Sequence, residues 1–422
     1  MAYPATFYAQ TLTDTQTRPA LQGRHDTDTL VIGGGLAGLT TALELARAGT
    51  QVTLLESESI GFGASGRNGG IVSPAFACDS SAIAARVGPA NARALHRLTI
   101  EGVQRLRANI DSLNITDAAL TPGMLHLRRF DRADDLHHHA ATFARDFDYT
   151  LTYLSQKQIA ERLFTNRYHH GLLDDQAFHI HPLNYLRALA REVERLGGRI
   201  HESSPATRAD LKSRTIRTAS GEIQARRLVF ATGGYTGPLI PRLQRAVLPI
   251  ATYMMLTEPA PDLIATAIAT RAAVLDDRRA SDYYRLVDDG KRLLWGGRIT
   301  TRAADADGVA RELRRAMLDV YPQLAPLKTE LAWSGQMAYA RHLMPQLGQL
   351  QPDVWHITAF GGHGLNTTAI AGKVLAEAML NQSDRIRMFA PFQLNWAGGL
   401  IGRTVAQLTY WRLQAQDKWR ER

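Results

Sequence analysis

The chain has 422 residues, more than one hydrophobic core usually accommodates, so we expect two joined domains. Its formal net charge is +9, but no patch interleaves basic with aromatic residues, which argues against a nucleic-acid-binding protein. The single cysteine, Cys78, excludes an internal disulfide and any multi-cysteine zinc or iron–sulfur centre. Because the N-terminus has no signal-peptide pattern and no run of about 18 apolar residues occurs, we expect a cytoplasmic protein.

The first informative feature is a glycine-rich turn between a strand and a helix. Residues 29–32 are a short apolar run typical of a buried strand, and apolar residues recur at helical spacing over 36–48. Gly49 ends that helix, and residues 51–55 predict a second strand. The glycines between the first strand and the helix fit the pattern G-x-G-x-x-G, which in this context predicts a dinucleotide-binding unit.

Each feature of that unit has a physical role in binding a dinucleotide. The first glycine allows a tight turn, the second lets the backbone approach a pyrophosphate, and the third lets the helix pack closely on the strand. The helix N-terminus faces the phosphate charge, and the acid after the second strand accepts hydrogen bonds from a ribose diol. This part of the chain supplies the first predicted cofactor-binding residues: Gly33, Gly35, Leu36, Ala37, Gly38, Glu56 and Ser57.

A loop of small residues follows the acid, where an NAD-binding domain would normally continue with another regular βα unit. Such a loop lets backbone amides reach a phosphate and then a flat ring without obstruction by side chains. The loop therefore favours FAD over NAD. Its predicted FAD-binding residues are Gly63, Ala64, Ser65, Arg67, Asn68, Gly69, Gly70 and Ile71.

Two later glycine clusters also lie at predicted strand ends. Residues 226–235 predict a buried strand that ends in small residues, which would pass beside the adenosine half of FAD. Residues 354–380 predict a strand, a Gly-Gly-His-Gly turn and a helix whose N-terminus would stabilise negative charge on a reduced flavin. The remaining predicted FAD-binding residues are Ala206, Ala231, Thr232, Gly233, Gly335, Gly362, His363, Gly364, Leu365 and Asn366.

With these segments the sequence resembles the D-amino-acid oxidase or glycine/sarcosine oxidase superfamily of FAD-dependent amine oxidoreductases, and within it the bacterial γ-glutamylputrescine oxidase branch. The resemblance implies hydride transfer from a C–N carbon of an amine or amino acid to flavin N5, giving an imine that water hydrolyses. It rests on segments spread over most of the chain: "IGFGASGRNGG" (60–70), "HIHPLN" (179–184), "DYYRL" (282–286), "RLLWGG" (292–297), "YPQL" (321–324), "WSG" (333–335), "RHLMPQLG" (341–348) and "GGHG" (361–364).

The chain departs from the superfamily at positions where other members have residues that bind flavin or substrate. Sarcosine oxidases tether FAD through a cysteine that corresponds to a position near Met337, so the resemblance implies non-covalent FAD here. The lysine that holds a substrate carboxylate in those enzymes is replaced by Asn366, and the glycine-oxidase arginine falls near Met337. The usual carboxylate clamp is thus missing or has moved.

We expect an α/β fold with a Rossmann-like FAD-binding domain and a second, mainly antiparallel β-sheet substrate domain. The FAD-binding domain is predicted to be discontinuous, over 24–110, 166–241 and 341–394, and the substrate domain to cover 111–165 and 242–340. Residues 288–290 predict a hairpin turn in the substrate domain. The run His137-His138-His139 is interpreted as a solvated helix face, so no metal site is predicted.

Four residues are predicted to act on the substrate: Tyr284, Arg298, Trp333 and His363. Arg298 can bind a carboxylate bidentately, which would favour a cyclic secondary amino acid such as pipecolate or proline over a γ-glutamylated polyamine. The alternative is that Arg298 only covers a strand surface. His363 is interpreted as part of the flavin loop rather than as a base.

Residues 395–422 form an amphipathic helical tail with apolar residues on one face and tryptophans and basic residues nearby. This composition suits either a peripheral contact with the inner face of the cytoplasmic membrane or a terminal helix docked on the FAD-binding domain. Oxidases of the superfamily often place a lysine over the flavin, and none of the six lysines here stands in an evident flavin-facing context. Both O2 and a quinone are therefore retained as electron acceptors.

Overall fold

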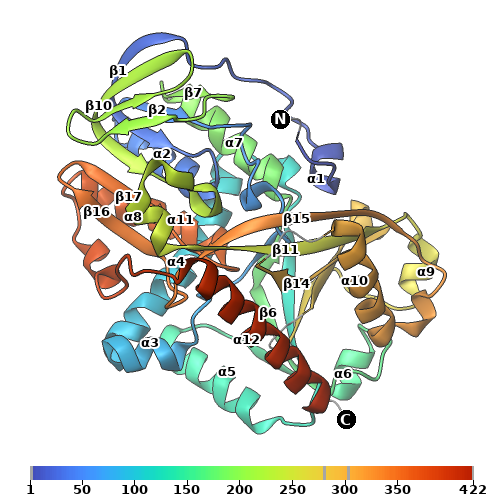
Figure 1. The fold of residues 1–422 in the computed structure, drawn as a ribbon. Coiled ribbons are helices and arrows are strands. Elements are labelled where there is room, and N and C mark those ends of the chain that lie inside the picture. The colour runs from blue at the N-terminus through green and yellow to red at the C-terminus, as the bar shows by residue number, and fades with distance from the viewer. Residues whose placement is uncertain (1–2, 279–281, 302–304, 421–422) are drawn as a thin grey trace.

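The computed structural model describes residues 3–278, 282–301 and 305–420, and its two β-sheets lie side by side (Figure 1). The first sheet has eight strands in the order β16-β17-β10-β1-β2-β7, with β9 beside β10 and β8 beside β9. Its strands are β1 (Gly23–Ile32), β2 (Val52–Leu55), β7 (Arg199–His201), β8 (Arg208–Asp210), β9 (Thr215–Arg217), β10 (Gly221–Phe230), β16 (Gln346–Gln351) and β17 (Val354–Thr358).

The centre of the first sheet is parallel, as a Rossmann-like fold requires. β1 pairs in parallel with both β2 and β10, and β10 pairs in parallel with β17. The last four residues of β1 and all of β2 are buried or nearly so, because helices cover the sheet. The helices packed together on this core are α2 (Leu36–Arg47), α4 (Pro89–Ser112), α7 (Pro182–Arg195) and α11 (Gly364–Met379).

The second sheet has nine strands in the order β15-β11-β14-β13-β12-β4-β6-β3, with β5 beside β6. All of its pairings are antiparallel except that of β4 with β12, so the expectation of a mainly antiparallel second sheet is met. Its strands are β3 (Ile71–Val72), β4 (Thr121–Arg128), β5 (Thr152–Ser155), β6 (His170–His179), β11 (Leu248–Thr257), β12 (Ala273–Asp276), β13 (Tyr283–Val287), β14 (Arg292–Thr300) and β15 (Thr329–Tyr339).

Several local predictions agree with the structure. The predicted strand–turn–helix–strand unit appears as β1, α2 and β2, and the later strand–turn–helix unit appears as β17 and α11. The predicted hairpin joins β13 to β14 through a short 3-10 turn at Asp288–Gly290, where both aspartates have positive φ.

Two strands, β3 and β6, lie in the second sheet although their residues were expected in the FAD-binding domain. β6 falls within residues 166–241, yet it pairs with β3, β4 and β5. β3 belongs to the second sheet as well, so the chain passes from the first sheet to the second directly after the small-residue loop. The loop is therefore held at the junction of the two sheets.

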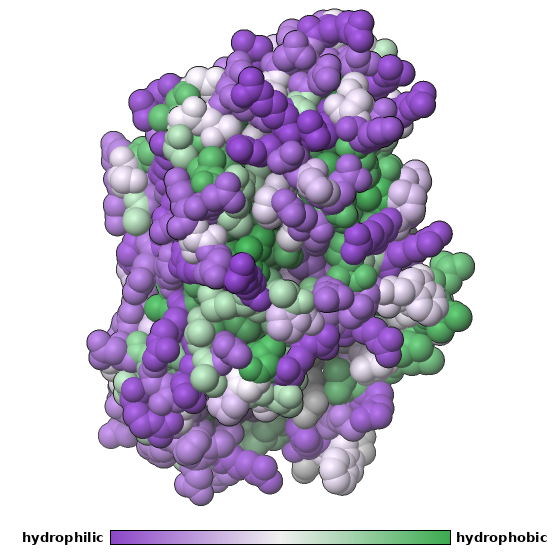
Figure 2. All heavy atoms as spheres, turned by 90° about the vertical axis from the view of Figure 1, so that its left-hand side faces the viewer, coloured by the Kyte–Doolittle hydropathy of each residue, from purple (hydrophilic) through white to green (hydrophobic). Residues whose placement is uncertain are grey.

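Among the remaining helices, α5, α6, α9 and α10 lie around the second sheet and α8 lies beside the first (Figure 1). Seen from the left-hand side of that view, the surface is mainly hydrophilic, with hydrophobic residues gathered near its middle (Figure 2). The C-terminal helix, α12, crosses in front of the second sheet and is tied to residues just after β14. The other helices of four or more residues are α1 (Phe7–Gln10), α3 (Ser80–Val87), α5 (Asp134–Phe147), α6 (Gln156–Ala160), α8 (Pro241–Ala246), α9 (Pro261–Ala265), α10 (Ala306–Val320) and α12 (Gly399–Arg420).

Candidate FAD and substrate site

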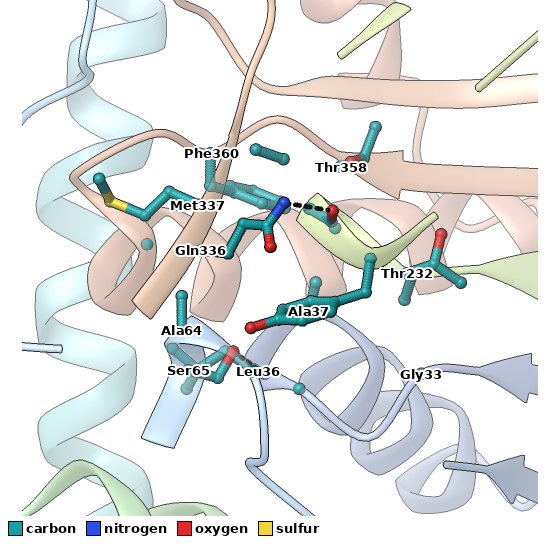
Figure 3. Close-up of a pocket in the computed structure, with 18 of the residues that line it drawn as sticks. Gly33, Leu36, Ala37, Ala64, Ser65, Thr232, Gln336, Met337, Thr358 and Phe360 are labelled. Carbon is teal, nitrogen blue, oxygen red and sulfur yellow. Dashed lines mark hydrogen bonds between the residues drawn. The ribbon is translucent and has the colours of Figure 1, made fainter. Parts of the chain in front are cut away.

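A single large cavity connects the glycine-rich ends of the first sheet to the face of the second sheet. Its volume is about 1180 Å3, larger than the roughly 300–1,000 Å3 of an ordinary small-molecule pocket. Figure 3 shows Gly33, Ala37 and Ser65 on one side of it, with Met337 and Phe360 opposite. A cavity of this size and lining can hold a dinucleotide together with a small substrate.

The glycines of the first turn are required by close packing. A Cβ atom on Gly38 would lie 1.9 Å from the carbonyl oxygen of Gly33, and one on Gly33 would lie 2.5 Å from the carbonyl oxygen of Ala231. Gly33 also has a φ of +115°, which side chains rarely allow. These contacts hold α2, β1 and β10 close together and open the space above the turn to a ligand backbone or phosphate.

Two helix N-termini border the same cavity. α2 begins after Gly35 and α11 after His363, and neither of these N-cap residues accepts a side-chain hydrogen bond from its helix. The N–H of Leu36 donates to the hydroxyl of Ser65 at 3.0 Å, so the small-residue loop is tied to the start of α2. Helix N-termini attract negative charge, which suits a pyrophosphate at α2 and the pyrimidine edge of a flavin at α11.

Glu56 lies at the end of β2 and borders the cavity. Its carboxylate accepts hydrogen bonds from the backbone N–H of Gly34 at 2.6 Å and of Glu58 at 2.9 Å. Burial raises the pKa of Glu56, and these hydrogen bonds oppose that rise. Glu56 is thus fixed beside the turn, in the place where an acid would accept hydrogen bonds from a ribose.

The small-residue loop is held by bonds from three other parts of the chain. The buried guanidinium of Arg67 donates to the carbonyl of Ser334 and to the hydroxyl of Tyr235, and the indole N–H of Trp333 donates to the carbonyl of Arg67 at 3.0 Å. From the N-terminal segment, the hydroxyl of Tyr8 donates to the carbonyl of Asn68 at 2.7 Å. Trp333 and Arg67 therefore position the loop and do not border the cavity.

Tyr283, rather than Tyr284, reaches the cavity from β13. Successive side chains of a strand point to opposite faces, and here Tyr283 lies over Gly69, where an added Cβ would be 2.7 Å from its ring. Tyr284 is buried in the second core, stacked on Trp295 at 4.2 Å and bonded to the hydroxyl of Tyr321 at 2.7 Å. Tyr284, which was predicted to act on the substrate, therefore does not border the cavity.

The titratable groups on the substrate side are mostly uncharged at neutral pH. Burial lowers the pKa of His363 to about 4 and raises the pKa of both Tyr283 and Tyr339 to about 12. Arg298 is the exception, a guanidinium that borders the cavity from β14. This side of the cavity can accept a neutral amine beside aromatic rings, and Arg298 can bind a negatively charged group of the same ligand.

Twenty-one of the predicted FAD-binding residues border the cavity and four do not. Gly38 packs against Gly33, Arg67 and Gly335 lie behind the loop, and Asn366 is buried with its amide donating to the carbonyl of Ala75. Those that border it are Gly33, Gly35, Leu36, Ala37, Glu56, Ser57, Gly63, Ala64, Ser65, Asn68, Gly69, Gly70, Ile71, Ala206, Ala231, Thr232, Gly233, Gly362, His363, Gly364 and Leu365.

The structure also adds residues that the sequence pattern does not single out. Thr358 is the last residue of β17 and Phe360 follows that strand, while Gln336 lies on β15, where its amide donates to the carbonyl of Gly234 at 3.3 Å (Figure 3). Tyr410 reaches the cavity from the C-terminal helix. The alternation of polar and apolar residues near the end of β15 predicts that Gln336 and its neighbours point to opposite faces of the sheet. It does not predict which of the two faces borders the cavity.

Cys78 is half-buried, and the adjacent Ala77 borders the cavity whereas Cys78 does not. None of the lysines is among the residues that border the cavity in the part of the chain that the structure describes, and Lys291 instead faces Asp288 at the hairpin. Over the same residues, no group of three or more His, Cys, Asp or Glu side chains is arranged to hold a metal ion.

The comparisons with known proteins agree with this site. The family described as "FAD dependent oxidoreductase" (DAO) matches residues 28–378. "Gamma-glutamylputrescine oxidoreductase" of Escherichia coli is 34% identical over 86% of this chain and 86% of its own.

Solved structures of two relatives share the fold. "Crystal structure of glycine oxidase from Geobacillus kaustophilus" has a TM-score of 0.74 at 21% identity and covers 88% of this chain and 99% of its own. "Crystal structure of L-proline dehydrogenase from P.horikoshii" has a TM-score of 0.72 at 18% identity and covers 87% and 96%. With the family match over most of its length, the chain belongs to the DAO family of FAD-dependent oxidoreductases that act on amines and amino acids.

Proposed function

We propose that the protein oxidises the C–N bond of a small amine, with a γ-glutamylated polyamine as the leading substrate class. The observation that carries the proposal is the single cavity, which joins the FAD cradle of the first sheet to a substrate wall built from the second. The likeness to the Escherichia coli γ-glutamylputrescine oxidoreductase over most of both chains supports this substrate class.

The residues around the cavity suit this chemistry. When bound, FAD supplies the two-electron acceptor for the carbon next to nitrogen. The chain's own part is to hold that carbon against the ring, with Tyr283 and Tyr339 as neutral aromatic walls. His363, whose pKa is lowered to about 4, remains uncharged and accepts a hydrogen bond more readily than a proton. We also propose that FAD is held without a covalent bond, since Cys78 does not border the cavity.

Anaerobic mixing with candidate amines tests the proposal. γ-Glutamylputrescine is expected to bleach the flavin absorbance of the FAD-loaded enzyme, while pipecolate, proline and sarcosine are expected to act more slowly. Bleaching by pipecolate or proline alone would favour a cyclic secondary amino acid, the second substrate class. If none of the four bleaches the flavin, the proposed function is wrong.

A second candidate function places the enzyme on a membrane and passes its electrons to a quinone rather than to O2. It is favoured by the outer face of α12, where large apolar side chains are half to four-fifths exposed and exposed basic residues flank them. Such a face suits the boundary between lipid head groups and acyl chains. Within the described residues, no helix has the length and apolarity to cross a bilayer, so this contact would be peripheral. The exposed apolar residues are Leu400, Ile401, Val405, Leu408, Trp411 and Trp419.

Replacing Leu400, Leu408 and Trp411 together by serine is expected to lower binding to phosphatidylglycerol vesicles about tenfold, since each removes exposed apolar area that would enter the lipid. Co-sedimentation measures this, with vesicles of zwitterionic lipid as the control. All three side chains are at least half exposed and none borders the cavity, so flavin content should stay the same. Equal sedimentation of variant and parent would rule out the membrane contact, and fast peroxide formation in air would rule out the quinone.

A further inference from the structure

Arg298 occupies a backbone position that is unusual for an arginine. In the pairing of β11 with β14, Tyr253 lies opposite Gly297 and Thr252 opposite Ile299, so Arg298 is the extra residue of a β-bulge. Its φ is +58°, in the left-handed region. Bulge residues with this conformation are usually glycine, because a side chain there is strained. Strained residues persist mainly where their side chains serve a function, and bulges often turn a side chain toward a site.

Arg298 borders the cavity, and its guanidinium makes only long ion pairs with its neighbours. Its nearest acidic atoms, on Asp282 and Glu312, lie at 3.8 and 3.6 Å, beyond hydrogen-bond distance. Its buried Nε has no hydrogen-bond partner among the described residues. Asp282 is already paired with Arg278. The guanidinium is thus held only by these long ion pairs, and its terminal nitrogens, rather than the sealed Nε, can donate to a ligand in the cavity.

A second unsatisfied polar group lies beside this guanidinium. Tyr410 of α12 borders the cavity and is 6% exposed. Its hydroxyl lies near Arg298 and Ile299, yet within the described chain it makes no hydrogen bond of standard geometry. A buried hydroxyl without a partner is costly unless a ligand or water satisfies it.

The helix that carries Tyr410 is fixed to the same end of β14. The backbone N–H of Thr301 donates to the side-chain oxygen of Gln407 at 3.0 Å, and the hydroxyl of Thr301 donates to the carbonyl of Arg403 at 3.0 Å. α12 lies wholly beyond residue 378, where the family match ends. The terminal helix therefore contributes Tyr410 to the wall of the cavity from outside the segment that the family model covers.

We propose that Arg298 and Tyr410 together bind a carboxylate of the substrate and that α12 is in this way a specificity-determining element. The inference rests on the proposed function and narrows its substrate to an amine that also bears a carboxylate. A guanidinium can hold both carboxylate oxygens, and the tyrosine hydroxyl can donate a further hydrogen bond. The nearby Asp282 and Glu312 disfavour a doubly charged phosphate, so a singly charged carboxylate is the better match.

Arg298→Gly gives a test in which loss of folding is not expected, since glycine removes the strain of the left-handed bulge. The probes are N-butylglutaramate, which has a carboxylate and an amide but no oxidisable amine, and N-butylpentanamide, which lacks the carboxylate. Calorimetry on the FAD-loaded enzyme should show that Arg298→Gly binds N-butylglutaramate about 10- to 100-fold more weakly, as for loss of a charge-assisted pair. Tyr410→Phe should weaken it about 3- to 10-fold.

Neither substitution should change the affinity for N-butylpentanamide, and the thermal midpoint of Arg298→Gly should equal or exceed that of the parent. Arg226→Ala, which removes an exposed arginine on β10, is the matched control and should leave both affinities unchanged. If the parent does not prefer N-butylglutaramate, or if Arg298→Gly keeps that preference, the inference is wrong. Because neither probe is oxidised, this result is independent of whether any amine bleaches the flavin.

Discussion

Replacing Gly38 by alanine is expected to lower the free energy of unfolding by about 3 kcal/mol and to abolish retention of FAD. The added Cβ would lie 1.9 Å from the carbonyl oxygen of Gly33 and 3.4 Å from Cβ of Ala231, both in the tight turn. Since the first contact is with backbone, α2 must move away from the sheet, and its N-terminus then no longer faces the phosphate site. Urea denaturation and the flavin absorbance of the purified protein measure the two effects.

Gly364→Ala is the matched control for this substitution. Gly364 begins α11 and borders the same cavity, but no atom lies within 4 Å of where its Cβ would be. The flavin-free protein should therefore keep its stability or gain up to about 1 kcal/mol, because alanine favours a helix. If Gly38→Ala retains both parental stability and flavin, the turn does not require close packing, and the account of the FAD cradle given above is wrong.

The FAD side of the site follows from the sequence because local rules determine it. A glycine is needed wherever backbone approaches backbone or phosphate, so the sequence alone places Gly33, Gly35 and Gly70 on the predicted path of the dinucleotide. The helices that begin at Leu36 and Gly364 were predicted from the same sequence pattern, in which a strand is followed by glycines and then by apolar residues at helical spacing. This half of the fold was therefore predicted closely.

The substrate side depends on contacts between distant segments and was predicted less well. The alternation in β13 shows that Tyr283 and Tyr284 face opposite ways, but only the packing of Trp295 and Tyr321 decides which one is buried. Tyr410 borders the cavity only because α12 docks beside β14. Likewise, β6 joins the second sheet through pairing with β4, which no local pattern specifies.

Acidification is expected to destabilise the protein through two buried histidines of the segment 179–184. Burial, assisted by Arg285, lowers the pKa of both His179 and His181 to about 3. His181 is the N-cap of α7, and its Nδ1 accepts the N–H of Asn184 at 3.0 Å, which a protonated ring cannot do. His179 accepts from the guanidinium of Arg285 at 2.9 Å in the same way. Both rings must therefore remain neutral for these hydrogen bonds to persist.

The direction of the pH effect follows from the depressed pKa values. An unfolded histidine takes up a proton near pH 6.5, whereas each folded ring resists protonation until about pH 3, so the unfolded state binds more protons between these values. The contribution of each neutral ring to the free energy of unfolding is fully present above pH 6.5 and is lost as the pH falls toward 3. Between pH 7 and pH 5 each is expected to account for a loss of about 2 kcal/mol.

His181→Asn isolates one of these contributions, because asparagine is an effective N-cap without a titrating ring. In urea titrations with excess FAD, the loss of unfolding free energy between pH 7 and pH 5 should be about 2 kcal/mol smaller in this variant than in the parent. Glu192→Gln serves as the control, since this acid lies near the exposed end of the same helix and its pKa is lowered by Arg195. A variant with the parental pH dependence would show that His181 is protonated as readily in the folded protein as in the unfolded chain. The segment would then owe its order to the packing of α7 rather than to a neutral histidine cap.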